Sequence, residues 1–109
     1  MNSRFVINEL KKYSSSTRAK SSARFFKTQR GQYGFGDEFL GVSVPNQRKV
    51  ARLYANLSLV ETKKLLMSRV HEHRLTALII LVDQYSKSDL KQKDHIFNFY
   101  LKNLKYVNN

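Results

Sequence analysis

The sequence is short of several residue types on which other classes of protein depend. Its 109 residues include no cysteine and no tryptophan, one proline and four glycines. Without cysteine the chain can form neither a disulfide framework nor a thiolate metal site, which suits a reducing compartment. The longest apolar run, at 75–82, is too short to cross a bilayer, and the N-terminus lacks the apolar core of a signal peptide.

Acidic residues are also scarce. Eight Asp and Glu stand against twenty Lys and Arg, which gives a formal net charge of +12. Such an excess favours a polyanionic partner, and nucleic acid comes first among the candidates. An anionic membrane surface, ribosomal RNA and a basic surface without a partner are the alternatives. With 41% hydrophobic and 12% aromatic residues, the chain can bury the core of one modest domain.

Hydrophobic periodicity predicts an all-α fold of about six helices. The expected helices cover residues 4–13, 17–27, 45–56, 58–68, 70–86 and 89–106. The helix over 70–86 is apolar nearly all round its middle, which predicts a central buried helix. Stacked antiparallel helix pairs, as in a HEAT-like superhelix, satisfy this pattern, and no interior linker divides residues 1–109 into two domains.

Several residues are predicted to begin helices. Pro45 suits the first helical position, because its fixed φ is already helical. Ser58 and Glu61 have the spacing of a capping box. Ser88 is expected to cap the sixth helix.

Apolar residues at helical spacing predict which faces pack into the core. The expected core positions are Ala19, Ser22, Ala23 and Phe26 in the second helix, Val50, Leu53, Tyr54 and Leu57 in the third, and Leu90, Phe97, Leu101 and Leu104 in the sixth. The sixth helix also has more apolar surface than one side can hide. We therefore expect self-association through its exposed face.

One long loop interrupts the helices, and it holds all four glycines. It lacks the glycine spacing of a P-loop or a dinucleotide-binding turn, and no strand precedes it. Its glycines permit turns, and Tyr33, Phe35 and Phe39 are expected to anchor it to the helices. Asp37 is expected to bond amides of the loop.

No constellation of side chains identifies an enzyme or a metal site. In the segment HEHR, His71 and His73 are two positions apart and point to different faces of a helix, and His95 is distant in sequence. We expect no metal ion and interpret the three as ordinary histidines on or near helix surfaces. No pair of acids has a spacing that indicates a general acid and base, and no serine lies in G-x-S-x-G.

Basic residues gather on both sides of the loop. Lys20, Arg24 and Lys27 repeat at i, i+4 and i+7 and form a basic stripe on the second helix. Arg30 and Arg48 lie closer to the glycines. The N-terminal end of the helix that begins at Pro45 is expected to face a phosphate with its backbone amides and Arg48.

Four segments together resemble the DNA alkylation repair family, the helical HEAT-like-repeat glycosylases of the AlkD type. These segments are ARFFKT (23–28), GQYGFGDEFLGVSVPNQRKVA (31–51), HEHRLTALIILVDQY (71–85) and FYLKNLKYVNN (99–109). The resemblance implies a curved stack of helix pairs that holds double-stranded DNA by its backbone. It implies hydrolysis of the N-glycosidic bond of N3- and N7-alkylated purines, without base flipping and without a metal or organic cofactor.

The resemblance also assigns residues. Phe25 corresponds to an aromatic residue near the lesion, and Ser43 to a polar residue near the lesion, although a small hydroxyl replaces a longer amide. With the basic residues, the expected DNA-binding set is Lys20, Arg24, Phe25, Lys27, Arg30, Ser43, Arg48, Lys49 and Arg52.

The catalytic machinery of the family is not expected among these residues. The family's catalytic Asp lies in a tryptophan-containing segment that follows a string like LKYVNN, so no catalytic residue is assigned in this chain. We expect residues 1–109 to be the N-terminal half of a longer glycosylase, inactive alone, in the bacterial cytosol near the nucleoid. A non-catalytic nucleic-acid-binding module and a protein-interaction scaffold are the alternatives.

Overall fold

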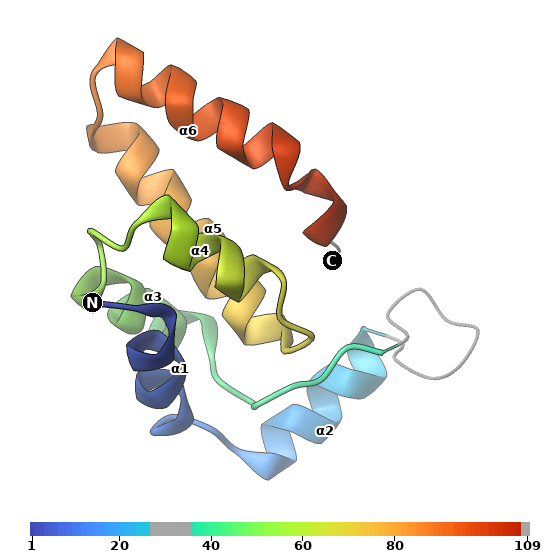
Figure 1. Ribbon diagram of the computed structural model, residues 1–109. Helices are drawn as coiled ribbons and strands as arrows, with labels where there is room; N and C mark the ends of the chain where they lie inside the picture. The colour runs from blue at the N-terminus through green and yellow to red at the C-terminus, as the bar shows by residue number, and fades with distance from the viewer. Residues whose placement is uncertain (27–35, 108–109) are drawn as a thin grey trace.

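The computed structural model describes residues 1–26 and 36–107, and this part is built from α-helices (Figure 1). The elements are α1 (Ser3–Lys11), α2 (Ser16–Phe25), α3 (Val44–Leu53), α4 (Leu59–Leu66), α5 (His71–Lys87), α6 (Leu90–Lys102) and a 3-10 turn, η1 (Leu104–Tyr106). No strand occurs in the described ranges, where the β-type pairing is an isolated bridge between Glu38 and Val70. The predicted all-α class is confirmed, and the arrangement is consistent with a helical repeat fold.

Helix α5 is the centre of the packing. It contacts α3, α4 and α6, while α1 packs against α3 and α4 (Figure 1). The prediction of a central buried helix is therefore confirmed. The buried hydrophobic residues are Val6, Leu10, Val42, Val50, Ala51, Leu57, Leu65, Leu66, Ala77, Ile80, Leu81 and Ile96. They come from every helix except α2, so the core forms without that helix.

The expected core face of the third helix is correct apart from one position. Val50 and Leu57 are buried and Tyr54 is half-buried against the core. Leu53, however, is 60% exposed. It lies in the last turn of α3, on a side that neither α1 nor α5 covers.

The expected core face of the sixth helix is wrong. Its members are all exposed: Leu90 86%, Phe97 49%, Leu101 46% and Leu104 44%. Helix α6 lies at the edge of the stack and packs mainly against α5 (Figure 1). It buries Ile96 there, and Phe99 lies partly buried against the core. Outside this narrow stripe Leu90 and Leu101 are exposed, and Phe97 borders an apolar groove between α5 and α6.

The start of α4 shows half of the predicted capping box. Ser58 is the N-cap, and its hydroxyl accepts a hydrogen bond from the Glu61 amide at 3.2 Å. The Glu61 carboxylate does not reach back to Ser58. It accepts a bond from the Ser3 amide at 2.8 Å and thereby ties α4 to the start of α1. Lys64, at 2.7 Å, and the Ser3 amide hold the pKa of Glu61 at about 2.

The cap of α6 differs from the prediction by one residue. Asp89 is the N-cap, with its carboxylate accepting the bond from the third amide of the helix at 2.8 Å. Ser88 instead ends α5, where its hydroxyl donates to the Gln84 carbonyl at 2.6 Å. A carboxylate at this position also suits the positive end of the helix dipole.

Helix α2 is attached to the rest of the protein mainly through the loop that follows it. None of the residues of α2 is fully buried. The side that was predicted to face inward, which includes Ala19 and Phe26, is only half-buried. Within the described residues, no helix is long and apolar enough to span a membrane.

Candidate nucleic-acid interface

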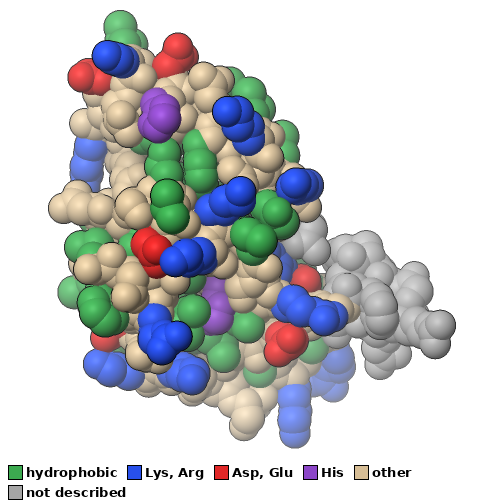
Figure 2. All heavy atoms as spheres, viewed as in Figure 1, with side chains coloured by type: hydrophobic (Ala, Val, Ile, Leu, Met, Phe, Trp, Pro, Cys, Tyr) green, Lys and Arg blue, Asp and Glu red, His purple; other side chains and the backbone are tan. Residues whose placement is uncertain are grey.

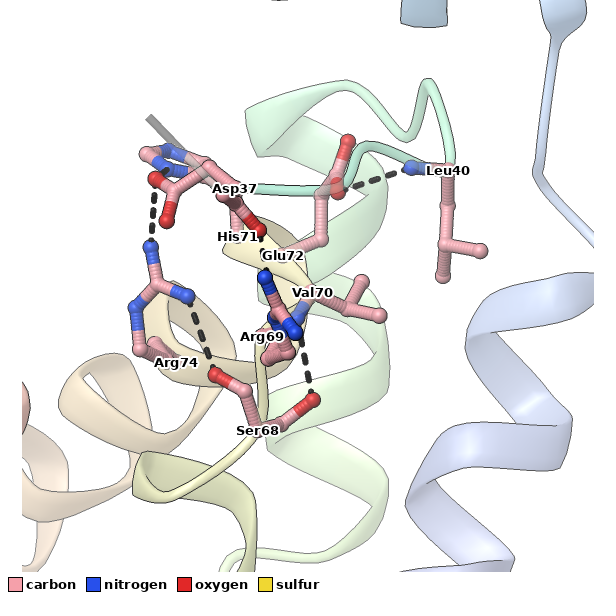
Figure 3. A network of polar contacts seen from close by, with 9 residues as sticks. Asp37, Leu40, Ser68, Arg69, Val70, His71, Glu72 and Arg74 are labelled. Carbon is pink, nitrogen blue, oxygen red and sulfur yellow. Dashed lines mark hydrogen bonds and ion pairs between the residues drawn. The ribbon is translucent and has the colours of Figure 1, made fainter. Parts of the chain in front are cut away.

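The loop from Gly36 to Ser43 is fixed by one carboxylate of α5. Glu72 is 2% exposed, and its two oxygens accept hydrogen bonds from three successive amides, of which Figure 3 shows the one from Leu40. Leu40 donates to Oε1 at 3.0 Å, and Gly41 and Val42 donate to Oε2 at 2.9 and 3.2 Å. Because Glu72 also lies in the first turn of α5, the helix dipole stabilises its charge. The bonds satisfy a stretch of backbone that has no helix or sheet of its own.

Gly41 brings this loop against the start of α2. Its φ is +78°, and a Cβ at this position would lie 1.9 Å from the Ser15 carbonyl oxygen and 2.7 Å from the Ala19 amide. The Ser15 amide donates to the Leu40 carbonyl at 3.0 Å. Only glycine has both the backbone conformation and the small size that this contact requires. Glu72 and Gly41 together therefore set the position of α2.

A second acid holds the beginning of the loop. Asp37 pairs with Arg74 at 2.8 Å, and Arg74 also donates to the Ser68 carbonyl at 3.0 Å (Figure 3). The His71 ring nitrogen lies 3.9 Å from the same carboxylate oxygen. Asp37 was expected to bond loop amides, but within the described residues that role belongs to Glu72. Asp37 instead neutralises the buried guanidinium of Arg74.

An aromatic cluster continues this contact to the end of α2. The ring centroids of Phe26 and Phe39 are 5.6 Å apart, and both rings pack on His71, at 4.6 and 5.0 Å. Phe25 meets Phe26 edge-on at 5.1 Å but is 74% exposed. The cluster therefore supports an aromatic ring that points into solvent at the end of α2. Of the predicted anchors, Phe39 is confirmed, while Tyr33 and Phe35 lie outside the described residues.

The predicted cations of α2 are accessible. Lys20 and Arg24 are exposed, and neither makes an ion pair with an acid among the described residues. Lys27 and Arg30 lie outside the described residues. The structure thus places two of the four predicted cations of this region on the same short helix as Phe25.

The cations of α3 are also accessible. Arg48, Lys49 and Arg52 are exposed, and no carboxylate among the described residues pairs with them. Lys and Arg side chains are not gathered in a single patch on the face that Figure 2 shows, where they extend from one end of the molecule to the other with few acids between them. The excess of positive charge is therefore spread over this face rather than confined to one site.

Ser43 has a structural role at the start of α3. Its hydroxyl accepts from the Asn46 amide at 3.3 Å, and its carbonyl accepts from the Gln47 amide at 2.9 Å. Pro45 was predicted to be the first helical residue; it is the second, after Val44, still lies in the first turn, and has no amide hydrogen. Two amides of this helix end are already bonded inside the protein. A phosphate at this end would therefore depend on the Arg48 side chain.

The histidines of α5 are not surface residues. His73 is buried, and its Nδ1 lies 2.8 Å from the Ser68 hydroxyl. Burial lowers the pKa of both His71 and His73. The description of both as residues on or near a helix surface is therefore wrong for His73 and only partly right for His71. Among the described residues, no group of three His, Asp or Glu could hold a metal ion.

Two residues that organise this region, Glu72 and Arg74, were not found from the sequence. Both lie in HEHR, where the histidines draw attention first. A signal was available: a loop without regular structure needs partners for its amides, and an acid in the first turn of a buried helix can supply them. Their actual partners lie 31 and 37 positions away in the sequence, so periodicity gives no indication of them.

The helices form an all-α repeat protein with a strongly basic surface. A polar network lies at one end of the central helix α5, and exposed cations lie on its neighbours. The chain belongs to the family of DNA alkylation repair enzymes, whose family model matches residues 6–109. Searches of curated proteins and of solved structures gave no significant match. Membership of the family indicates a role in DNA alkylation repair, with DNA as the partner.

Proposed function

We propose that this chain grips double-stranded DNA by its backbone through the cations of α2 and α3, with Phe25 placed near a damaged base. The observation that carries the proposal is the exposure of Lys20, Arg24 and Arg48 without acidic partners among the described residues. When such side chains neutralise phosphates, they release the counterions that surround the DNA. This release is the main source of affinity for a DNA backbone. Phe25 offers a ring face or edge for contact with a base.

The reaction that this proposal serves is hydrolysis of the N-glycosidic bond of N3- or N7-alkylated purines. It needs a carboxylate against the positive charge that develops on the sugar. Five of the eight acids of this chain are already engaged by cations or amides. These are Glu9, Asp37, Glu61, Glu72 and Asp89, the last of which caps α6. We therefore assign residues 1–109, as the N-terminal half of a glycosylase, to DNA binding rather than to bond cleavage. We place the protein in the cytosol at the nucleoid.

Fluorescence anisotropy with a labelled duplex tests the DNA grip. Arg48→Ala is expected to reduce the magnitude of the negative slope of log affinity against log salt by about 0.9, the value for one lost phosphate contact. Lys63→Ala, an exposed change of the same charge on α4, is the matched control and should leave the slope unchanged. Equal slopes for the two variants would contradict the assignment of Arg48.

Two further measurements test the finer parts of the proposal. A single-stranded competitor should displace the duplex poorly if the duplex form is recognised. Phe25→Leu should reduce the preference for a duplex with N7-methylguanine over an undamaged one, because a smaller and non-aromatic side chain then lies near the lesion. Free base released by this chain alone, above a no-protein control, would refute the assignment to binding only.

Self-association is a second possibility that one feature favours. An apolar groove of about 350 Å³ lies between α5 and α6, with Val82, Tyr85, Phe97 and Tyr100 in its lining. Two copies facing each other across these grooves would cover the exposed side of α6. The +12 charge on each copy opposes this contact and salt screens the repulsion. Light scattering should therefore show association that rises with salt, whereas DNA binding falls; a monomer at every salt and protein concentration would exclude it.

A further inference from the structure

A hollow of about 250 Å³ lies between the loop, the connection from α4 to α5, and η1. The residues that matter here are Gly36 and Asp37 from the loop, Arg69 and Arg74 around the start of α5, and Lys105 from η1. Since a water molecule takes about 30 Å³ of liquid, the hollow has room for several waters or for one phosphate group with its ester oxygens. The residues that line the hollow lie outside α2 and α3, the helices that carry the cations of the proposed DNA grip.

The charge around this hollow is positive. Three cations and one acid line it, a balance of 3 − 1 = +2. Asp37 is paired with Arg74 at 2.8 Å, so each of these two charges is compensated by the other. The two that remain, on Arg69 and Lys105, are exposed and have no carboxylate partner among the described residues. An anion that enters the hollow therefore meets two free cations and an acid that is already neutralised.

Both free cations are held at the hollow by neighbouring groups. The Nε of Arg69 donates a long hydrogen bond of 3.4 Å to the Gly36 carbonyl. Gly36 has a φ of +90°, and a Cβ there would come within 3.0 Å of Nη2, so glycine allows the guanidinium to lie against the backbone. The ammonium of Lys105 lies 5.3 Å from the centroid of the Tyr106 ring, within the range of a cation–π interaction. The terminal nitrogens of Arg69 remain available for an acceptor.

We propose that this hollow binds one phosphate of the nucleic-acid backbone, a contact point separate from α2 and α3. The assignment rests on the proposed DNA grip, because only a polyanion that spans the protein would use both places at once. A guanidinium offers paired donors that match two phosphate oxygens, and an ammonium supplies a second charge from the other side. The Asp37–Arg74 pair forms the wall between the hollow and the core.

The test is a salt titration of duplex binding by the whole chain. The double variant Arg69→Ala, Lys105→Ala is expected to reduce the magnitude of the negative slope of log affinity against log salt by about 0.9, the contribution of one phosphate. The ratio of wild-type affinity to variant affinity should decrease by about 3.5-fold between 50 and 200 mM salt, since 4 raised to the power 0.9 is about 3.5. Lys87→Ala, Lys91→Ala removes the same charge from exposed positions at the end of α5 and the start of α6, away from η1, and should leave the slope unchanged.

Further arms separate this inference from its alternatives. Arg69 also holds the loop, so Lys105→Gln, which removes no hydrogen bond from the loop, should give the same direction of change in a folded protein. Equal slopes for the hollow variants and the control, with normal binding by the wild type, would overturn the inference and leave the DNA grip intact. Failure of the wild type to bind any duplex would overturn both.

The source of the anion is tested with inorganic phosphate alone. Phosphate should shift the NMR signals of the Arg69 side chain in the free protein, and duplex DNA should abolish that effect by competition. If phosphate binds at Arg69 but DNA does not compete, the hollow takes a free anion and the assignment to the nucleic-acid backbone is wrong.

Discussion

Replacement of Glu72 by glutamine is the sharpest test of how the loop is held. The amide has one oxygen for three donors. In its best orientation this oxygen takes the place of Oε2 and keeps the bonds from Gly41 and Val42, at 2.9 and 3.2 Å in the wild type. The NH2 group then faces the Leu40 N–H, which loses its 3.0 Å bond.

The expected loss of stability follows from these bonds. An unsatisfied buried donor costs about 1–3 kcal/mol. The two remaining bonds lose the assistance of a negative charge, which weakens each by about 1 kcal/mol. Removal of a buried charge returns part of this cost. We expect a net decrease of about 2–4 kcal/mol in the free energy of unfolding, a large share of the 5–15 kcal/mol typical of a whole domain.

The assay combines urea unfolding with amide hydrogen exchange. The amides of Leu40, Gly41 and Val42 should lose protection first, because they open when the loop leaves α5. Glu38→Gln is the matched control, since Glu38 lies in the same loop and is exposed, and it should change the unfolding free energy by less than about 0.5 kcal/mol. If Glu72→Gln left the exchange of the three amides and the urea midpoint unchanged, the account of the loop would be refuted.

Three further substitutions test other parts of the structure. Gly41→Ala should destabilise the protein by at least about 2 kcal/mol in urea, because its Cβ meets the Ser15 carbonyl at a positive φ; a smaller loss would show that the loop can move aside. Burial lowers the pKa of His73 below the ordinary 6.5, so the unfolded state binds more protons and stability should fall as pH drops below 6.5; His73→Gln should flatten this dependence, and exposed His95→Gln should not. The pKa of Glu61 is lowered from 4.5 to about 2, so its contribution should be lost as pH falls from 4.5 towards 2, and Glu61→Gln should remove that acid-dependent part of the unfolding curve.

The sequence was sufficient for features that depend on near neighbours in the chain. The apolar stretch of α5, Pro45 in the first turn of α3 and the hydroxyl cap at Ser58 all follow from local rules, and the structure agrees with each. The core face of α6 was misjudged because periodicity identifies apolar residues but not how many neighbours will cover them. Leu101 illustrates this, since it has helical spacing and no partner helix.

The candidate site was accessible to sequence reasoning only in part. The predicted cations that are described lie at the surface, where their charge and helical positions suggested they would be. The network that supports them depends on pairs such as Gly41–Glu72 and Asp37–Arg74, which are brought together by the whole fold. The hollow at Arg69 and Lys105 depends on it too, because the hairpin of α5 and α6 places η1 next to the loop (Figure 1).

The absence of α2 from the hydrophobic core has a consequence for how this protein can change. The orientation of that helix is set by backbone contacts at Gly41 and Ser15, by the bonds to Glu72 and by the packing of Phe26 on Phe39 and His71. A substitution at Gly41 or Ser15 can therefore tilt α2 and move its charged residues without repacking any side chain of the hydrophobic core. The orientation of α2 can thus adjust to ligands of different curvature, while the hydrophobic core that keeps the protein folded stays unchanged.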